Sequence, residues 1–268
     1  NPSATGAVAV YLADTGRVFT DGEEGVGIYA LNYGFGAATI DVSGSIETAQ
    51  PYSDGALSLV NNGSSSANAT IDINEAGSVW VRGEQSYGAW SYNLGSGEAR
   101  VTNLGSVLAT GSQSGGLTSF ATLGDAIVTN FSSVTASGEY GTGIIADSVS
   151  GAANVEIASG ATVTGGWQAD ATGAGPSSNR PSSGVLLRSM ASTLTNAGTI
   201  TAASDRAIGD VGRWAAARGA VATNNSGTVT GYLELAAVAG NSFANTAGGL
   251  FDVRHFADTD GDGTRDTK

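Results

Sequence analysis

Apolar and polar residues alternate in short stretches throughout the chain. Residues 39–42 (TIDV), 70–73 (TIDI) and 154–157 (NVEI) each place β-branched residues on one side of an extended backbone and polar residues on the other. This period of two predicts β-strands. A helical repeat is excluded because apolar residues do not recur every three or four positions, and because glycine, a poor helix former, occupies 41 of the 268 positions.

A segment of related sequence recurs along the chain and ends each time in an apolar residue. Its clearest copy is residues 126–134 (AIVTNFSSV), and close relatives lie at 101–107, 194–200 and 222–229. Sequence repeats of about 20 to 50 residues indicate a solenoid, a propeller or an array. The copies recur about every 28 residues, which is too short for a four-stranded propeller blade and suits three short strands. The closing apolar residues are Val18, Ile46, Val79, Val107, Val134, Val163, Ile200, Val229 and Leu250.

A second repeated element begins with glycine and continues as a short apolar strand. Each repeat therefore predicts a glycine-led strand, a second strand such as 39–42, and a third strand through the closing apolar residue. We predict an all-β fold, a right-handed parallel β-helix (β-solenoid) of about nine turns with three short strands per turn. The glycine-led strands are expected at 27–30, 55–58, 88–91, 143–146 and 184–187.

The repeats run through nearly the whole chain without a linker. This predicts one β-helix domain over residues 1–257 and an acidic tail over residues 258–268. The chain starts at Asn1, strand-like sequence begins already at residues 7–12, and the last residues lie within a polar motif. We therefore expect a processed form or a segment of a longer protein.

Asparagine recurs at one corner of the predicted turns. Asparagine tolerates left-handed backbone and can hydrogen-bond to a stacked neighbour, so we interpret these residues as a structural ladder. The five residues are Asn103, Asn130, Asn196, Asn224 and Asn245.

Composition and charge exclude several classes of binding partner and site. The formal net charge is −13, with ten arginines and one lysine, which argues against nucleic acid or an anionic membrane surface. No cysteine is present, so disulfides and thiolate sites are excluded, and no run of 18 apolar residues predicts a membrane-spanning helix. Little lysine with abundant Gly, Ser, Thr, Asn and Ala is typical of a secreted β-solenoid.

The repeats resemble the passenger domains of bacterial autotransporters. The resemblance rests on corners at 196–200 (NAGTI) and 225–229 (NSGTV), on the glycine-led strands at 27 and 143, and on residues 241–250 (NSFANTAGGL). It covers almost the whole chain. It implies a β-helix that is exported through a C-terminal outer-membrane barrel. That barrel is not among these residues, and it would be the chain's only link to a membrane.

Many such passengers are adhesins or self-associating surface proteins, and some carry a protease or esterase domain. We therefore expect a non-enzymatic module, located outside the cell on a bacterial surface, that mediates adhesion or self-association. The expected partner is a protein or glycan on a host or neighbouring cell, or another copy of the chain.

The glycine-led strands carry a candidate contact surface. If Ile28 and Ala30 face the core, an apolar stripe points outward, and exposed apolar stripes mark contact sites. Two alternatives remain open: the strands have the opposite phase, or loops cover the stripe. The contact candidates are Tyr29, Leu57, Trp90 and Tyr92, with Ile145, Leu186, Leu31 and Leu59 in the same two columns.

A second contact candidate is a cluster of cations in this acidic chain. Arg206, Arg213 and Arg218 lie close together in sequence with Trp214, a pattern suited to an anionic partner or a neighbouring subunit. The alternative is local pairing with the nearby acidic residues Asp205 and Asp210.

The alternative function is a polysaccharide lyase or glycosidase on a β-helix scaffold. Asp41 and Asp72 occupy equivalent outward positions in successive turns, about one strand spacing apart. Two carboxylates at that distance raise one pKa or bind a cation, and close pairs occur in retaining glycosidases. The simpler interpretation is a solvated polar face. Catalysis by a Ser-His-Asp triad fits poorly, because His255 is the single histidine and no Gly-x-Ser-x-Gly elbow is present.

The tail resembles the front of a calcium loop. Asp258, Asp260 and Asp262 stand at loop positions 1, 3 and 5, Gly263 follows at position 6 and Asp266 at position 9. Alternating carboxylates suit one hard cation, so Ca²⁺ is the expected cofactor. The usual bidentate Glu at position 12 is missing. A flexible acidic tail is the alternative.

Overall fold

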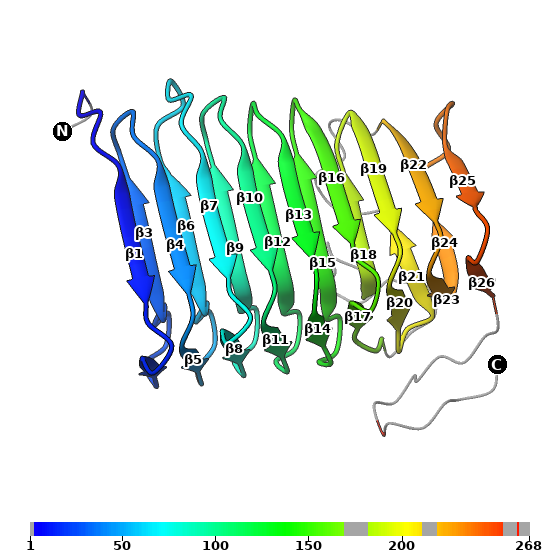
Figure 1. The fold of residues 1–268 in the computed structure, drawn as a ribbon, viewed down its shortest axis with the longest axis horizontal. Helices are drawn as coiled ribbons and strands as arrows, with labels where there is room; N and C mark the ends of the chain where they lie inside the picture. Colours follow the sequence, from blue (N-terminus) through cyan, green and yellow to red (C-terminus); the bar gives the residue numbers. More distant parts are fainter. Residues whose placement is uncertain (1–2, 169–181, 211–218, 254–261, 263–268) are drawn as a thin grey trace.

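The computed structural model describes residues 3–168, 182–210, 219–253 and 262. In this part of the chain there are three long parallel sheets and no helix. Each turn contributes one strand to each sheet, except that the last contributes only to the first two. Figure 1 shows the strands stacked along one axis from β1 to β26. The predicted right-handed parallel β-helix with three short strands per turn is confirmed.

The first sheet contains nine strands in chain order, each paired in parallel with the strand of the next turn. Alternate residues face inward, as the burial of Ile40, Ile71, Val101 and Val128 shows. The strands are β1 (Val8–Leu12), β4 (Ala38–Val42), β7 (Ala69–Ile73), β10 (Ala99–Asn103), β13 (Ala126–Asn130), β16 (Ala152–Ile157), β19 (Ala191–Asn196), β22 (Ala220–Asn225) and β25 (Ser242–Asn245).

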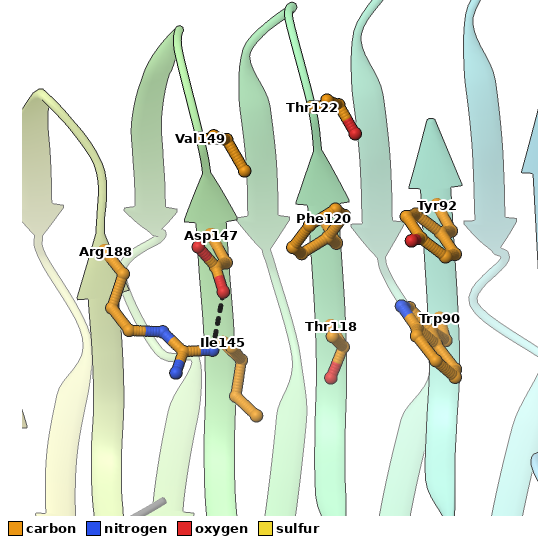
Figure 2. Close-up of a pocket in the computed structure, with 9 residues that line it drawn as sticks. All are labelled: Trp90, Tyr92, Thr118, Phe120, Thr122, Ile145, Asp147, Val149 and Arg188. Carbon is orange, nitrogen blue, oxygen red and sulfur yellow. Dashed lines mark ion pairs between the residues drawn. The ribbon is translucent and has the colours of Figure 1, made fainter. Parts of the chain in front are cut away.

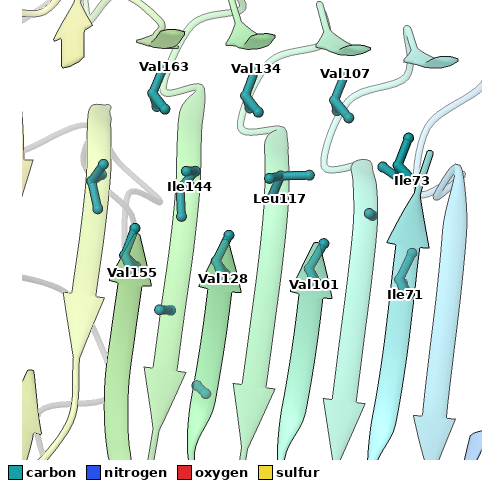
Figure 3. Packing of buried hydrophobic residues seen from close by; sticks show 14 of the residues in the cluster. Ile71, Ile73, Val101, Val107, Leu117, Val128, Val134, Ile144, Val155 and Val163 are labelled. Atoms are coloured by element: carbon teal, nitrogen blue, oxygen red, sulfur yellow. The ribbon is translucent and has the colours of Figure 1, made fainter. Parts of the chain in front are cut away.

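The second sheet also has nine strands and carries the closing apolar residues of the repeats. Val107, Val134 and Val163 stack in register between successive turns, as Figure 3 shows. One prediction is wrong by a residue: Phe251 pairs with Val229, while Leu250 pairs with Thr228 and is exposed. The strands are β2 (Arg17–Thr20), β5 (Ser45–Thr48), β8 (Ser78–Val81), β11 (Ser106–Ala109), β14 (Ser133–Ala136), β17 (Thr162–Gly165), β20 (Thr199–Ala202), β23 (Thr228–Thr230) and β26 (Leu250–Asp252).

The third sheet has eight strands and corresponds to the glycine-led element. Gly88 shows why glycine precedes it: a Cβ there would lie 2.4 Å from Cγ1 of Val107 and 2.7 Å from the carbonyl oxygen of Gly116. The backbone of one turn therefore packs directly against the next. The strands are β3 (Ile28–Asn32), β6 (Ala56–Val60), β9 (Tyr87–Asn93), β12 (Gly115–Ala121), β15 (Thr142–Ser148), β18 (Ser183–Arg188), β21 (Arg206–Gly209) and β24 (Tyr232–Glu234).

The asparagine ladder exists, with one member different from the prediction. Asn103 donates to Asn130 at 2.7 Å, and Asn196 donates to Asn225, which donates in turn to Asn245, also at 2.7 Å each. Asn224 is not part of it: it pairs with Thr195 in the register and faces outward, because β22 presents Asn225 at the corner.

Left-handed backbone occurs at another corner, so that part of the asparagine interpretation is wrong. In the described chain the non-glycine residues with positive φ all lie between a second-sheet strand and the following third-sheet strand. None of them is asparagine or β-branched, and their φ angles range from 54° to 63°. We call this set the left-handed corner: Glu24, Tyr52, Gln85, Gln113, Tyr140 and Asp205.

Candidate ligand-binding groove

On the third sheet, the residues that point outward are the ones that the sequence analysis predicted. Ile28 and Ala30 belong to the buried core, and Tyr29 between them points outward with 44% of its surface exposed. Parallel pairing aligns two outward columns along the rod. One contains Tyr29, Leu57, Trp90, Thr118, Ile145 and Leu186; the other contains Leu31, Leu59, Tyr92, Phe120, Asp147 and Arg188.

The stripe is not open along its whole length. Tyr29 is exposed and Leu57, Trp90 and Tyr92 are half-buried, but Ile145 is only 2% exposed and Leu186 is fully buried. Thr118 also interrupts the apolar column. The available apolar surface therefore lies on β3 to β12.

Aromatic rings gather on β9 and β12. Residues two apart on one strand share a face, which brings Trp90 and Tyr92 together with ring centroids 5.6 Å apart and planes within 8°. Tyr87 packs on Trp90 from one side at 5.0 Å, and Phe120 of the next turn meets Tyr92 edge to face at 4.8 Å. These geometries are favourable for aromatic pairs and fix the rings relative to one another.

A groove of about 450 Å³ lies beside these rings across β9, β12, β15 and β18. Its size falls in the range of small-molecule sites. Figure 2 shows the aromatic side chains at one end and an ion pair at the other. The lining residues are Trp90, Tyr92, Thr118, Phe120, Thr122, Ile145, Asp147, Val149 and Arg188.

The ion pair joins adjacent turns. Asp147 on β15 lies opposite Arg188 on β18, and Nη2 of the arginine is 2.6 Å from Oδ2 of the aspartate. Each side chain is only 7% exposed. Burial raises the pKa of the Asp147 carboxyl, and the Arg188 guanidinium opposes this shift without cancelling it. Burial therefore affects the pKa of this carboxyl more than its pairing with Arg188 does.

Trp90 and Thr118, which line the groove, each carry a buried polar atom that has no hydrogen-bond partner among the described residues. These atoms are the indole nitrogen of Trp90 and the hydroxyl oxygen of Thr118, and Thr118 is only 5% exposed. Most buried polar atoms in proteins are paired, so each exception asks for an explanation. One explanation is that these two groups form hydrogen bonds to a bound ligand.

Of the four residues in the predicted arginine cluster, one, Arg206, lies among the described residues. Arg206 is buried, is 2.6 Å from Oε2 of Glu234, and donates to the carbonyl of Ser182 at 3.1 Å. Its guanidinium pairs with Glu234, and the alternative of pairing between Arg213 or Arg218 and the nearby aspartates lies outside the described residues. Arg213, Trp214 and Arg218 lie outside the described residues.

Asp41 and Asp72 occupy paired positions, as predicted, on β4 and β7 of the first sheet. Asn74 donates to Asp41 at 2.5 Å and to Ser43 at 2.8 Å, so the Asp41 side chain is held in a polar network. This face belongs to a different sheet from the groove. The two carboxylates are therefore not part of the groove.

The predicted calcium loop lies almost entirely outside the described residues. Asp258, Asp260 and Asp266 fall there with His255, while Asp262 is described and exposed. Among the residues that the structure describes, no group of three or more His, Cys, Asp or Glu side chains is placed to hold a metal ion.

Asp147, Arg188, Thr118 and Phe120 are groove residues that the sequence interpretation missed. A signal existed, because Thr118 and Phe120 pair with the recognised residues Trp90 and Tyr92, and Asp147 and Arg188 continue the column of Tyr92 in the next two turns. The irregular spacing between the turns of Val163 and Ile200 concealed the match between Asp147 and Arg188.

The chain was compared with protein-family models, with curated proteins and with solved structures, and none of them matched. Within the described residues, no helix has the length and apolar character needed to cross a membrane. The resemblance to autotransporter passengers therefore stays a prediction from the sequence.

Proposed function

We propose that this chain is an extracellular cell-surface module that acts by adhesion or self-association through the outer face of its third sheet. The observation that carries the proposal is the fixed cluster of partly exposed aromatic rings on β9 and β12 beside a groove. Aromatic residues dominate the energetics of protein contact sites, and contiguous apolar surface on a soluble protein marks such sites.

The β-helix suits this role physically. Each turn packs only on its neighbours, so the side chains of one face form a long surface whose outward residues can vary without altering the core. The acidic net charge and low lysine content support a contact that does not depend on nucleic acid or on anionic lipid. The resemblance to autotransporter passengers agrees with a position on a bacterial surface.

We propose binding without turnover. Only one carboxylate, Asp147, lines the groove among the described residues, and it is engaged by Arg188. Glycosidases generally need two carboxylates across the scissile bond. Asp41 and Asp72 lie on another sheet, so the polysaccharide-acting alternative gains no support from the groove.

Beads coated with the purified chain test the proposal. Bead clustering reports self-association, and attachment to a panel of bacterial and animal cells reports adhesion. The test variant combines Trp90→Ser with Tyr29→Ser on the third sheet. The matched control combines Trp80→Ser with Tyr11→Ser, which removes an exposed Trp and an exposed Tyr from the other two sheets.

We expect the third-sheet variant to lose most of the clustering or attachment while the control keeps it. Both should melt within a few degrees of the parent chain. If the third-sheet variant unfolds, the single substitution Tyr29→Ser replaces it as the test variant, since the Tyr29 ring is more exposed than that of Trp90. Equal losses in test and control, or no attachment and no clustering by the parent chain, would overturn the proposal.

A further inference from the structure

We infer that the groove on β9, β12, β15 and β18 binds a short segment of an uncharged glycan. This rests on the proposed function and specifies the ligand of the same face. The inference stands on the combination of an aromatic wall, one compensated ion pair and unpaired polar groups within a single groove.

The aromatic wall favours a ligand with apolar patches. Trp90, Tyr92 and Phe120 supply three rings held in place by one another. Rings fixed in advance lose little side-chain freedom when a ligand binds. A sugar ring presents C–H groups on its faces and hydroxyls around its edge, so it can pack on rings and hydrogen-bond sideways at once.

The ion pair favours hydroxyl groups over charges. Asp147 offers acceptor oxygens and Arg188 offers donor nitrogens within 2.6 Å of each other. Neighbouring hydroxyls, each both donor and acceptor, match such a pair. The two charges compensate each other, so the groove gives no net attraction to an acidic or a basic ligand.

A peptide fits less well. Peptides that bind to β-sheets commonly add a strand at an open edge, where their backbone groups find partners. The groove lies on the face of the third sheet, between strands paired on both sides. A peptide backbone in it would leave many N–H and C=O groups unpaired, which is costly.

Thr118 provides a sharp probe. Its hydroxyl is buried and has no partner among the described residues, so replacing it with the isosteric valine should not lower stability. If a sugar hydroxyl uses this group, Thr118→Val should weaken binding about 3- to 10-fold. Thr118→Ser keeps a hydroxyl and should restore much of the affinity.

The experiment measures binding of the whole chain to immobilised neutral polysaccharides (glucan, mannan, galactan and xylan) beside acidic ones (polygalacturonate and hyaluronan). Calorimetry with oligosaccharides of the best binder follows. The variants are Phe120→Ser, Thr118→Val and Thr118→Ser. The controls are Phe131→Ser, which removes an exposed ring outside the groove, and Thr102→Val on the first sheet.

We expect a neutral polysaccharide to bind, Phe120→Ser to abolish binding, and Thr118→Val to weaken it with an unchanged melting temperature. Binding of acidic polysaccharides alone, or binding that ignores both groove variants, would overturn the inference. Adhesion or clustering that depends on Trp90 and Tyr29 with no glycan bound would overturn this inference and leave the proposed function standing. Release of shortened sugars would overturn the proposal of binding without turnover.

Discussion

The side-chain amide of Asn196 donates to the side-chain oxygen of Asn225 at 2.7 Å, one turn further along the rod. Asn225 repeats the pattern with Asn245 and also donates to the carbonyls of Gly227 and Leu250. The stacked amides join three successive turns. Asn196 and Asn225 are fully buried, whereas Asn245 is exposed.

Asn225→Ala should therefore lower the free energy of unfolding by about 1–3 kcal/mol, because it removes the hydrogen bonds that this fully buried side chain makes to neighbouring turns. Urea denaturation followed by circular dichroism measures the change. Asn224→Ala is the control: this neighbour points outward and is exposed, so its effect should stay within about 0.5 kcal/mol. Equal effects of the two substitutions would contradict the ladder.

Gly88→Ala should destabilise the chain by about 1–3 kcal/mol, the usual range for an overpacked site. The added methyl would meet Val107 at 2.4 Å and the backbone of Gly116 at 2.7 Å, and a stacked backbone has little room to move. Thermal unfolding reports the loss. Gly63→Ala is the matched control, since the single atom near its Cβ is 3.8 Å away. An unchanged melting temperature for Gly88→Ala would show that the turns are packed less closely than described.

Asp147 should give the chain a measurable dependence on pH. Its pKa is raised in the folded state by burial, so between the usual value of 3.8 and the raised value the folded chain binds more protons than the unfolded chain. The stabilisation due to this group is complete below pH 3.8 and is lost as pH rises through the folded pKa. The variant Asp147→Asn serves as the reference, because an asparagine side chain does not titrate.

The free energy of unfolding of the parent chain minus that of Asp147→Asn should thus fall as pH rises from about 3.5 and become constant above the raised pKa. Urea titrations at a series of pH values give the difference directly. A difference that grows with pH would mean that Arg188 lowers the pKa of the carboxyl more than burial raises it.

The architecture was predictable from the sequence because every turn of a β-helix is subject to the same packing constraints, so the same residue pattern recurs in each turn. The period-two strands, the closing residues such as Val107 and Val134, and the glycine-led strands each follow from local stacking. Errors arose where local motifs resemble one another: Asn224 beside Asn225 and Leu250 beside Phe251 differ only by register, which the pairing of whole strands decides.

The candidate site was only partly predictable. Trp90 and Tyr92 stand out in the sequence as large aromatic residues in an outward phase. Asp147 and Arg188 are about forty residues apart and become neighbours only through the pairing of β15 with β18 across an irregular turn. Arg206 differs in the opposite sense: its sequence neighbourhood suggested a contact surface, yet its side chain is buried and pairs with Glu234.

The left-handed corner leads into the strands that carry the groove: Gln85, Gln113 and Tyr140 each stand two residues before β9, β12 or β15. At this corner the backbone restricts residue type by shape alone, since β-branched side chains are poorly tolerated at positive φ while glutamine, tyrosine and glutamate are all found there. Substitutions that exchange one unbranched polar side chain for another should thus change the stability of the fold little. The corner ahead of the third sheet can therefore diversify in sequence among descendants of this chain while the stacking of its turns stays the same.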